Sequence, residues 1–207
     1  MCRVRVIGES SKKPLPLSNS DKGNRKTSLH RFSVHQHSAR HGGERHVENM
    51  GYKNMQAVYD VNRAGRMAIR RGDNMTLNKN AELVLMFMAS QTYDWDSENN
   101  CPPKKLMDKK VPCRYYTLGW RAISDSLGMV MLTPEQAMGG NAEAKMKTRE
   151  NSIQKSISDA WVFLRDRGII KTIEPASLGK NAGFLLLLGD DAENAAVERW
   201  ARECLGV

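Results

Sequence analysis

The sequence lacks a long apolar run. Runs such as Phe184–Leu188 are far shorter than the ~20 residues that a membrane-spanning helix needs. The first residues also lack the apolar stretch of a secretory signal. We therefore expect a soluble, cytoplasmic protein with no membrane partner.

Cysteine and histidine are not arranged as metal ligands. The cysteines form no C-x-x-C pair, which argues against a zinc site; they are Cys2, Cys101, Cys113 and Cys204. Cys101 and Cys113 bracket a basic loop and could pair under oxidising conditions, although free thiols are the expectation in the cytoplasm. All five histidines lie between His30 and His46, where a metal-binding tract is the alternative to a plain basic tail. We expect no metal site.

Catalytic motifs are missing as well. The chain has no phosphate-binding G-x-x-x-x-G-K-[ST], no G-x-S-x-G, and no histidine after His46. The carboxylates of the long polar loop predicted over Tyr93–Arg114 are too loosely spaced to act as an acid/base pair. We therefore expect no enzymatic activity and no cofactor.

Positive charge is concentrated at the start of the chain. Of the net charge of +9, residues 1–54 contribute +7, from 11 Lys and Arg against 4 Asp and Glu, whereas residues 81–180 hold 14 against 12. Residues 1–54 have few large apolar side chains to offset their ordering entropy, so we expect a disordered basic tail. Such a tail would add affinity for any DNA by releasing counterions. Met50 and Met55 stand where the composition changes, so translation could begin at either of them.

Residues 55–74 allow two interpretations. Apolar and basic side chains are weakly segregated there: Val58, Val61, Ala68 and Ile69 against Arg63, Arg66, Arg70 and Arg71. The segment could be a basic arm that lies along a phosphate backbone. It could equally be a surface helix with one solvated face, and the sequence favours neither.

Three helices are predicted within residues 75–189. Asn78 can cap the first, Thr117 the second, and Asn141 a long third helix that runs to about Arg167. Apolar residues at helical spacing give each helix a buried side. These residues are Leu83, Met86, Phe87 and Ser90, widened by Val84 and Met88, in the first; Trp120, Ile123 and Leu127 in the second; and Ile153, Ile157, Ala160, Trp161 and Leu164 in the third.

Two strand-like runs follow the third helix. They are Ile169–Glu174 and Phe184–Leu188, joined by a polar tip. Helix, helix, strand, small loop and strand is the layout of a winged helix-turn-helix, a mainly α fold with a small β-hairpin wing. The spacer Met129–Lys147 is much longer than the ~3–4 residues of a tight helix-turn-helix. This layout most often binds double-stranded DNA.

The third helix also has a polar side. Small polar and cationic side chains opposite an apolar stripe suit base edges and phosphates, and cations on the second helix and at the hairpin tip could join them. The DNA-binding residues predicted in this way are Arg121, Lys147, Thr148, Arg149, Asn151, Ser152, Lys155, Ser158, Lys180 and Asn181. A merely solvated face is the alternative.

Residues 190–207 predict an additional C-terminal amphipathic helix that begins at Asp191. Its apolar side is formed by Val197, Trp200, Ala201 and Leu205, with further alanines. This side could form a homodimer with Trp200 near the two-fold axis. Alternatively, it packs back on the first helix of its own chain and covers Met86 and Met88, which we favour slightly.

Two motifs carry a resemblance to a known family. Tyr115–Gly128, with its Tyr, Gly and Trp entry and Leu-Gly end, and the helix ending Leu164–Ile170 resemble winged helix-turn-helix proteins of actinobacterial plasmids and phages. The resemblance covers roughly residues 75–189 and implies double-stranded DNA binding by a transcription regulator or a replication initiator. Many relatives carry a cation where Asp159 stands. An acid there would repel phosphate, so the third helix is expected to contact DNA through its N-terminal half.

Another class of function remains open. The near-balanced charge of residues 81–180 also suits a winged-helix module that binds other proteins. The sequence does not separate a regulator from an initiator.

Overall fold

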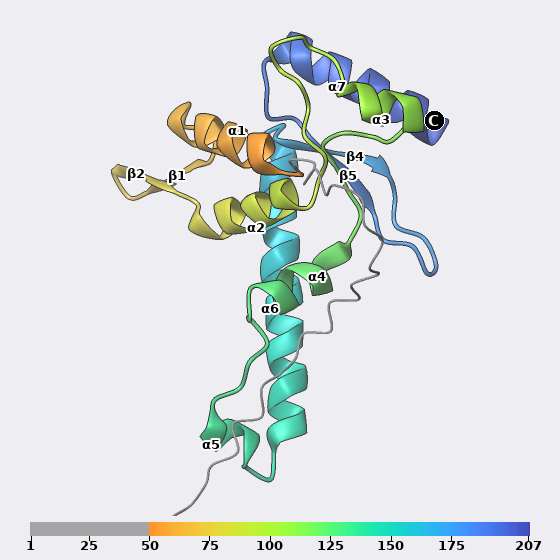
Figure 1. Ribbon diagram of the computed structural model, residues 1–207. Helices are drawn as coiled ribbons and strands as arrows, with labels where there is room; N and C mark the ends of the chain where they lie inside the picture. Colours follow the sequence, from red (N-terminus) through yellow and green to blue (C-terminus); the bar gives the residue numbers. More distant parts are fainter. Residues whose placement is uncertain (1–49) are drawn as a thin grey trace, which may run out of the picture. The chain divides into compact units, whose positions relative to one another are not determined.

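The computed structural model describes residues 50–207, which form helices and two small antiparallel sheets (Figure 1). The helices of this part are α1 (Tyr52–Arg63), α2 (Lys79–Ser90), α3 (Lys104–Lys109), α4 (Gly119–Ser126), α5 (Pro134–Ala137), α6 (Ala142–Asp166) and α7 (Asp191–Leu205). The strands are β1 (Ala68–Arg71), β2 (Asn74–Leu77), β3 (Tyr115–Tyr116), β4 (Ile170–Glu174) and β5 (Gly183–Leu186). None of these helices is both long and apolar enough to cross a membrane. The predictions for residues 1–49, including the histidine tract and the disordered tail, lie outside the described residues.

The C-terminal half of α6 is the centre of the main core. Ile153, Ile157, Ala160 and Leu164 are buried, as their spacing predicts. They pack with α1, α2, α4 and the sheet formed by β3, β4 and β5. Trp161 is partly buried; its indole N–H donates to the Met88 sulfur at 3.2 Å and its ring stacks at 4.9 Å from that of Phe184.

Helix α2 confirms its cap and, with Val84 and Met88 buried, part of its predicted apolar stripe. The Asn78 side chain accepts a hydrogen bond from the Ala81 N–H at 3.2 Å. The buried residues are Ala81, Val84, Leu85, Met88 and Ala89. Leu83, predicted to be in the stripe, is 45% exposed. The helix is apolar on nearly every side, and its contact with both α1 and α6 goes with the burial of Leu85 and Ala89, which the predicted stripe did not include.

Residues 55–74 form most of a helix and then a hairpin, rather than a single helix. Helix α1 begins at Tyr52, inside the predicted tail, and buries Val58 and Val61. The chain then forms the antiparallel hairpin β1–β2, which the sequence did not predict. Gly65, at φ +70°, follows the helix end, and Gly72, at φ +60°, lies in the hairpin turn.

Two further boundaries are corrected. The segment predicted as a loop before Arg114 contains helix α3, which follows Pro103 and is anchored by the buried Leu106. Helix α4 begins at Gly119, and the Thr117 side chain does not cap it. Instead, the Thr117 carbonyl accepts a hydrogen bond from Asn181. Helix α6 begins after Asn141, as predicted, although no cap hydrogen bond comes from the Asn141 side chain.

The larger sheet has the strand order β3–β5–β4, all antiparallel. Both faces of β5 are covered. Phe184 and Leu186 join the α6 core, whereas Leu185 joins a second apolar cluster with Val197 and Ala201 of α7. A strand buried on both faces explains the unbroken apolar run from Phe184.

Helix α7 packs on its own chain, but not where the sequence predicted. It lies beside α3 (Figure 1), and the Trp200 indole donates to the Val111 carbonyl at 3.0 Å. Met88 is already covered by Trp161, so α7 is not needed there. The buried Val197 and Ala201 are therefore not available to a homodimer through this apolar side.

A buried polar network joins three parts of the chain. Arg114 is 1% exposed, and its guanidinium donates to Glu193 of α7 at 2.5 Å and to the Asn54 side chain of α1 at 2.9 Å. The Asn54 N–H donates to the Asp94 carboxylate at 2.9 Å, and the Asn54 amide donates to the Tyr93 carbonyl at 3.0 Å. Arg114 has a φ of +52°, a conformation that a non-glycine residue keeps only where its surroundings fix it.

Replacing Glu193 should strongly destabilise the fold. Glu193→Ala leaves the Arg114 guanidinium buried without its counter-charge, and we expect a loss of about 3–5 kcal/mol in the free energy of unfolding. Urea unfolding followed by circular dichroism measures this loss. Glu203→Ala, on the exposed side of the same helix, is the control, and equal losses for the two variants would contradict the role of the ion pair.

Candidate nucleic-acid interface

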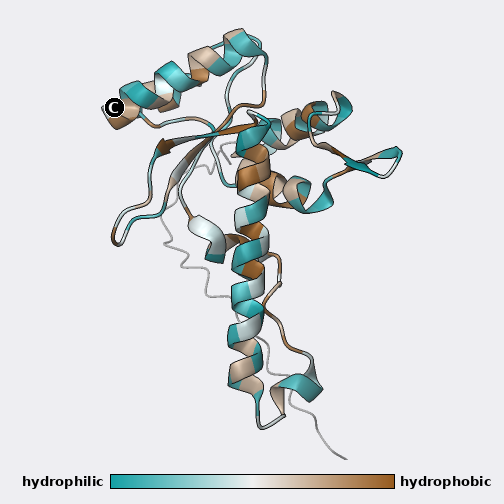
Figure 2. Ribbon diagram, turned by 180° about the vertical axis from the view of Figure 1, so that it is seen from behind, coloured by the Kyte–Doolittle hydropathy of each residue, from teal (hydrophilic) through white to brown (hydrophobic). Residues whose placement is uncertain are grey.

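Helix α6 is much longer than the core that it crosses. Its 25 residues span about 37 Å, but its buried residues begin only at Ile153. The N-terminal half projects from the core with the short helix α5 beside it (Figures 1 and 2). This projecting half carries much of the polar face that the sequence analysis selected.

The selected small polar residues lie on the exposed side of α6. Thr148, Asn151, Ser152 and Ser158 are all exposed, and at about 100° per residue they lie away from the buried stripe. The Thr148 hydroxyl donates to the Ala144 carbonyl at 2.9 Å, and the Ser152 hydroxyl to the Thr148 carbonyl at 3.0 Å. These oxygens keep lone pairs that can accept from a base amino group. Asn151 makes no side-chain hydrogen bond within the described residues, so both of its amide donors and its acceptor are available.

The cations of α6 are less available than their exposure suggests. Lys155 is 2.8 Å from Asp159, with 76% and 63% of the two side chains exposed. Arg149 donates to the Met129 carbonyl at 2.8 Å and so ties the spacer to the helix. Lys147 lies two residues before Arg149, roughly 200° around the axis, so these two side chains leave α6 on different sides.

The β4–β5 hairpin meets the start of α4. The Asn181 amide donates to the Thr117 carbonyl at 3.1 Å. A Cβ atom at Gly119, which has a φ of +78°, would lie 2.8 Å from the Asn181 amide, so no side chain fits there. Arg121 of α4 is exposed, with its guanidinium 5.4 Å from the Trp120 ring centre. Asn181 therefore lies beside the start of α4, the helix that carries Arg121.

Lys180, at the hairpin tip, is also paired with an acid. It lies 2.6 Å from Glu174, which accepts a second hydrogen bond from the Tyr115 hydroxyl. These hydrogen bonds, from Lys180 first and then from Tyr115, hold the pKa of Glu174 below its usual value. The carboxylate therefore stays charged and competes with any phosphate for Lys180.

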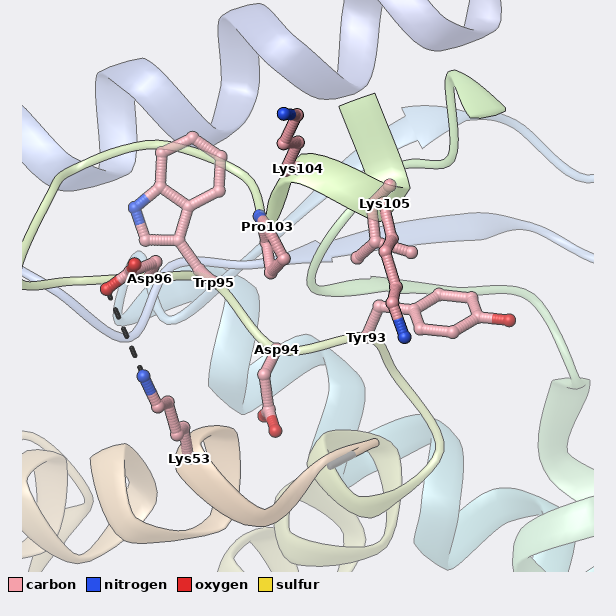
Figure 3. Close-up of a pocket in the computed structure, with 9 residues that line it drawn as sticks. Lys53, Tyr93, Asp94, Trp95, Asp96, Pro103, Lys104 and Lys105 are labelled. Carbon is pink, nitrogen blue, oxygen red and sulfur yellow. Dashed lines mark ion pairs between the residues drawn. The ribbon is translucent and has the colours of Figure 1, made fainter. Parts of the chain in front are cut away.

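A separate cavity of about 350 Å³ lies between α1 and α3 (Figure 3). Tyr93, Trp95 and Lys53 are among its lining residues, with the carboxylates of Asp94 and Asp96. Burial raises the pKa of Asp94. However, Asp94 accepts from a backbone N–H of α1, and Asp96 lies 3.9 Å from Lys53. These groups serve the fold, so we assign the cavity no ligand.

Residues 50–207 show neither a cluster of metal ligands nor a disulfide. No group of His, Cys, Asp and Glu there could hold a metal ion. Cys101, Cys113 and Cys204 are free. Burial, with a smaller effect from Cys204, raises the pKa of Cys113 to about 12, so it stays a protonated thiol at neutral pH.

Comparisons with known proteins identify no relative. No protein-family model, curated protein or solved structure matches the chain. The chain's own residues and geometry are therefore the evidence for its function. Sequence reasoning selected the exposed residues of α6, but it missed that acids hold Lys155 and Lys180; the i, i+4 spacing of Lys155 and Asp159 was a signal for the first pair.

Removing the acid on α6 should strengthen DNA binding. In Asp159→Asn, Lys155 loses its partner and the repelling carboxylate is gone, so we expect several-fold tighter binding to duplex DNA and a salt dependence steeper by about one phosphate contact. Stability should change by less than about 0.5 kcal/mol, because the pair is exposed. Fluorescence anisotropy over a salt series measures the affinity for duplex DNA and its salt dependence. Asp166→Asn, near the C-terminal end of α6, is the control; a matching gain there would show only an effect of net charge.

Proposed function

We propose that the protein is a non-enzymatic, double-stranded DNA-binding protein of the winged helix-turn-helix class. One observation carries the proposal: the long helix α6 presents a strip of exposed polar side chains, with Asn151 unpartnered among the described residues, next to a small sheet whose hairpin contacts the start of α4. In this assignment α4 and α6 are the helix pair, β3–β5–β4 is the sheet, and the β4–β5 hairpin is the wing.

The order of elements supports this assignment. After α2 and the short α3, the chain forms β3, α4, the short α5, α6, β4 and β5, and the central strand of the sheet is the last one, β5. Helix α4 contacts both α2 and α6, so it crosses at the centre of the packed helices. A helix in this position braces the one that follows, as the first helix of a helix-turn-helix braces the recognition helix.

The dimensions of α6 suit the major groove. A helix with its side chains is about 10–12 Å wide, and the groove is about 12 Å wide. The projecting half of α6 can enter a groove without a clash from the core. Within it, Asn151 offers the donor and acceptor pair that matches an adenine edge, and Lys155 follows one turn later. The hairpin tip with Lys180 would then lie on the phosphate backbone.

This chemistry indicates a class of biological roles and not one particular role. Sequence-directed DNA binding without catalysis suits a transcription regulator, or a plasmid or phage replication initiator that recruits other factors. The residues that distinguish DNA sequences are the same in both roles.

A second candidate is a winged-helix module that binds other proteins. The observation that favours it is exposed apolar surface on the projecting part: Met131 is 73% exposed and Met138 is 88% exposed. Carboxylates also pair with Lys155 and Lys180, which weakens the attraction of these cations for phosphate. DNA binding remains the stronger proposal, because Asn151 and its neighbours form a continuous polar strip on α6.

The experiment is selection of binding sites from genomic fragments, followed by measurement with a double variant. Asn151→Ala with Lys155→Ala should weaken binding to the selected site, by roughly 1–3 kcal/mol for each lost base contact, without unfolding the protein. Affinity for unrelated DNA should fall much less.

The matched control is Gln154→Ala with Arg165→Ala. It removes one amide and one cation from exposed positions of α6 that lie beside the polar strip. The proposal predicts near wild-type affinity for the control. Equal affinity of both double variants and wild type for the selected site would exclude α6 as the reading element.

A further inference from the structure

The β1–β2 hairpin projects from the fold with most of its surface exposed. Its strands pair from Ala68 with Leu77 to Arg71 with Asn74, and every residue of β2 is exposed. At about 3.4 Å per residue, four residues give an arm of about 13 Å beyond its base. Among the described elements, the two strands pack mainly on each other.

The base of the hairpin is fixed to the end of α6. Arg167 donates to the Ala68 carbonyl at 3.0 Å. Arg66 donates to the Gly168 carbonyl at 3.1 Å, directly after α6, and the Asn78 N–H donates to the Met67 carbonyl at 3.0 Å. The arm therefore has a defined position relative to the proposed recognition helix. In both views the two hairpins leave α6 on opposite sides (Figures 1 and 2).

The hairpin carries the positive charge that the polar strip lacks. Residues 66–79 contain four cations and one carboxylate: Arg66, Arg70, Arg71 and Lys79 against Asp73. None of the four forms an ion pair with another described residue, in contrast to Lys155 and Lys180. Arg70 bonds only to the Gly72 carbonyl, at 3.1 Å, and the Arg71 side chain has no partner within the described residues.

The unpaired positive charge of the hairpin favours a polyanion as its ligand. Arg70 and Arg71 are consecutive in β1, so their guanidiniums leave opposite faces of the two-stranded ribbon, where each can bind a phosphate oxygen. Such a ribbon is narrow enough to follow a groove edge. A protein with acidic patches would also attract the charge. Nucleic acid is favoured because the arm is fixed to the end of α6, on the side away from the β4–β5 hairpin.

We propose that the β1–β2 hairpin is a second DNA-binding element, in which Arg70 and Arg71 hold backbone phosphates at one flank of the site that α6 reads. The inference rests on the proposed function. It assigns the salt-dependent, sequence-independent share of binding to this hairpin, while α6 supplies the preference for a sequence.

The test is Arg70→Ala with Arg71→Ala in the full chain. Affinity for the selected duplex and for an unrelated duplex should fall by a similar factor, roughly tenfold at 0.1 M salt, and the slope of log K against log salt should decrease by about 1–2. A hydroxyl-radical footprint should shorten at one end and keep its centre. Arg70→Lys with Arg71→Lys should retain most of the salt slope, because the charge remains.

The charge-matched control is Lys109→Ala with Arg199→Ala. Both cations are exposed, one on α3 and one on α7, and neither forms an ion pair within the described residues. If the control and hairpin variants have the same affinity and the same footprint, the hairpin's role is overturned, while DNA binding by α6 stands. A wild-type chain that binds no duplex overturns the proposed function itself. Loss of binding to anionic phosphatidylserine vesicles, with DNA binding unchanged, would overturn the inference in favour of a membrane surface.

Discussion

The buried guanidinium of Arg114 is the constraint on which the arrangement of the described chain depends. A buried charge costs several kcal/mol unless its partners are all in place. Here the partners come from α1 and from α7, 79 residues further along the chain. The Arg114 backbone also accepts a hydrogen bond from Leu186 at the end of β5. Helix α1, the sheet and α7 therefore stabilise one another through a single residue.

This network leaves α6 free to project. Its C-terminal half is held by α2, α4 and the sheet, whose other face is closed by α7. No residue of the projecting half is needed in the core, so its exposed side can carry Asn151 and other polar groups without a cost in packing. The carboxylates beside Lys155 and Lys180 keep this side nearly neutral. In our account they restrain non-specific binding, so that base contacts decide where the protein stays.

The sequence predicted the elements whose signal is local. The buried stripe of α6 and the Asn78 cap are confirmed, because both depend on residues three or four positions apart. The buried side of α2 was predicted only in part, since Leu83 and Leu85 are both apolar and only contacts with other helices decide which of them is buried. The β1–β2 hairpin was missed because Ala68–Arg71 contains one β-branched residue and matches a helix equally well.

Long-range pairings could not be predicted at all. Nothing in the sequence connects Arg114 with Glu193 or Asn54, and a charge in a polar loop is normally exposed. The same holds for Asn181 and Thr117, which meet only when the sheet forms. The DNA-binding roles of the residues on α6 remain predictions, although the structure places them on the exposed side of the helix.

The most direct test of the central claim is methylation interference on the selected duplex, because it distinguishes the two grooves. Methylation of guanine N7 adds a group in the major groove, and methylation of adenine N3 adds one in the minor groove. If α6 enters the major groove, N7 methylation of guanines within the centre of the site should block binding by the full chain, and N3 methylation of adenines in the same stretch should not. Binding that tolerates N7 methylation throughout the footprint would contradict the account.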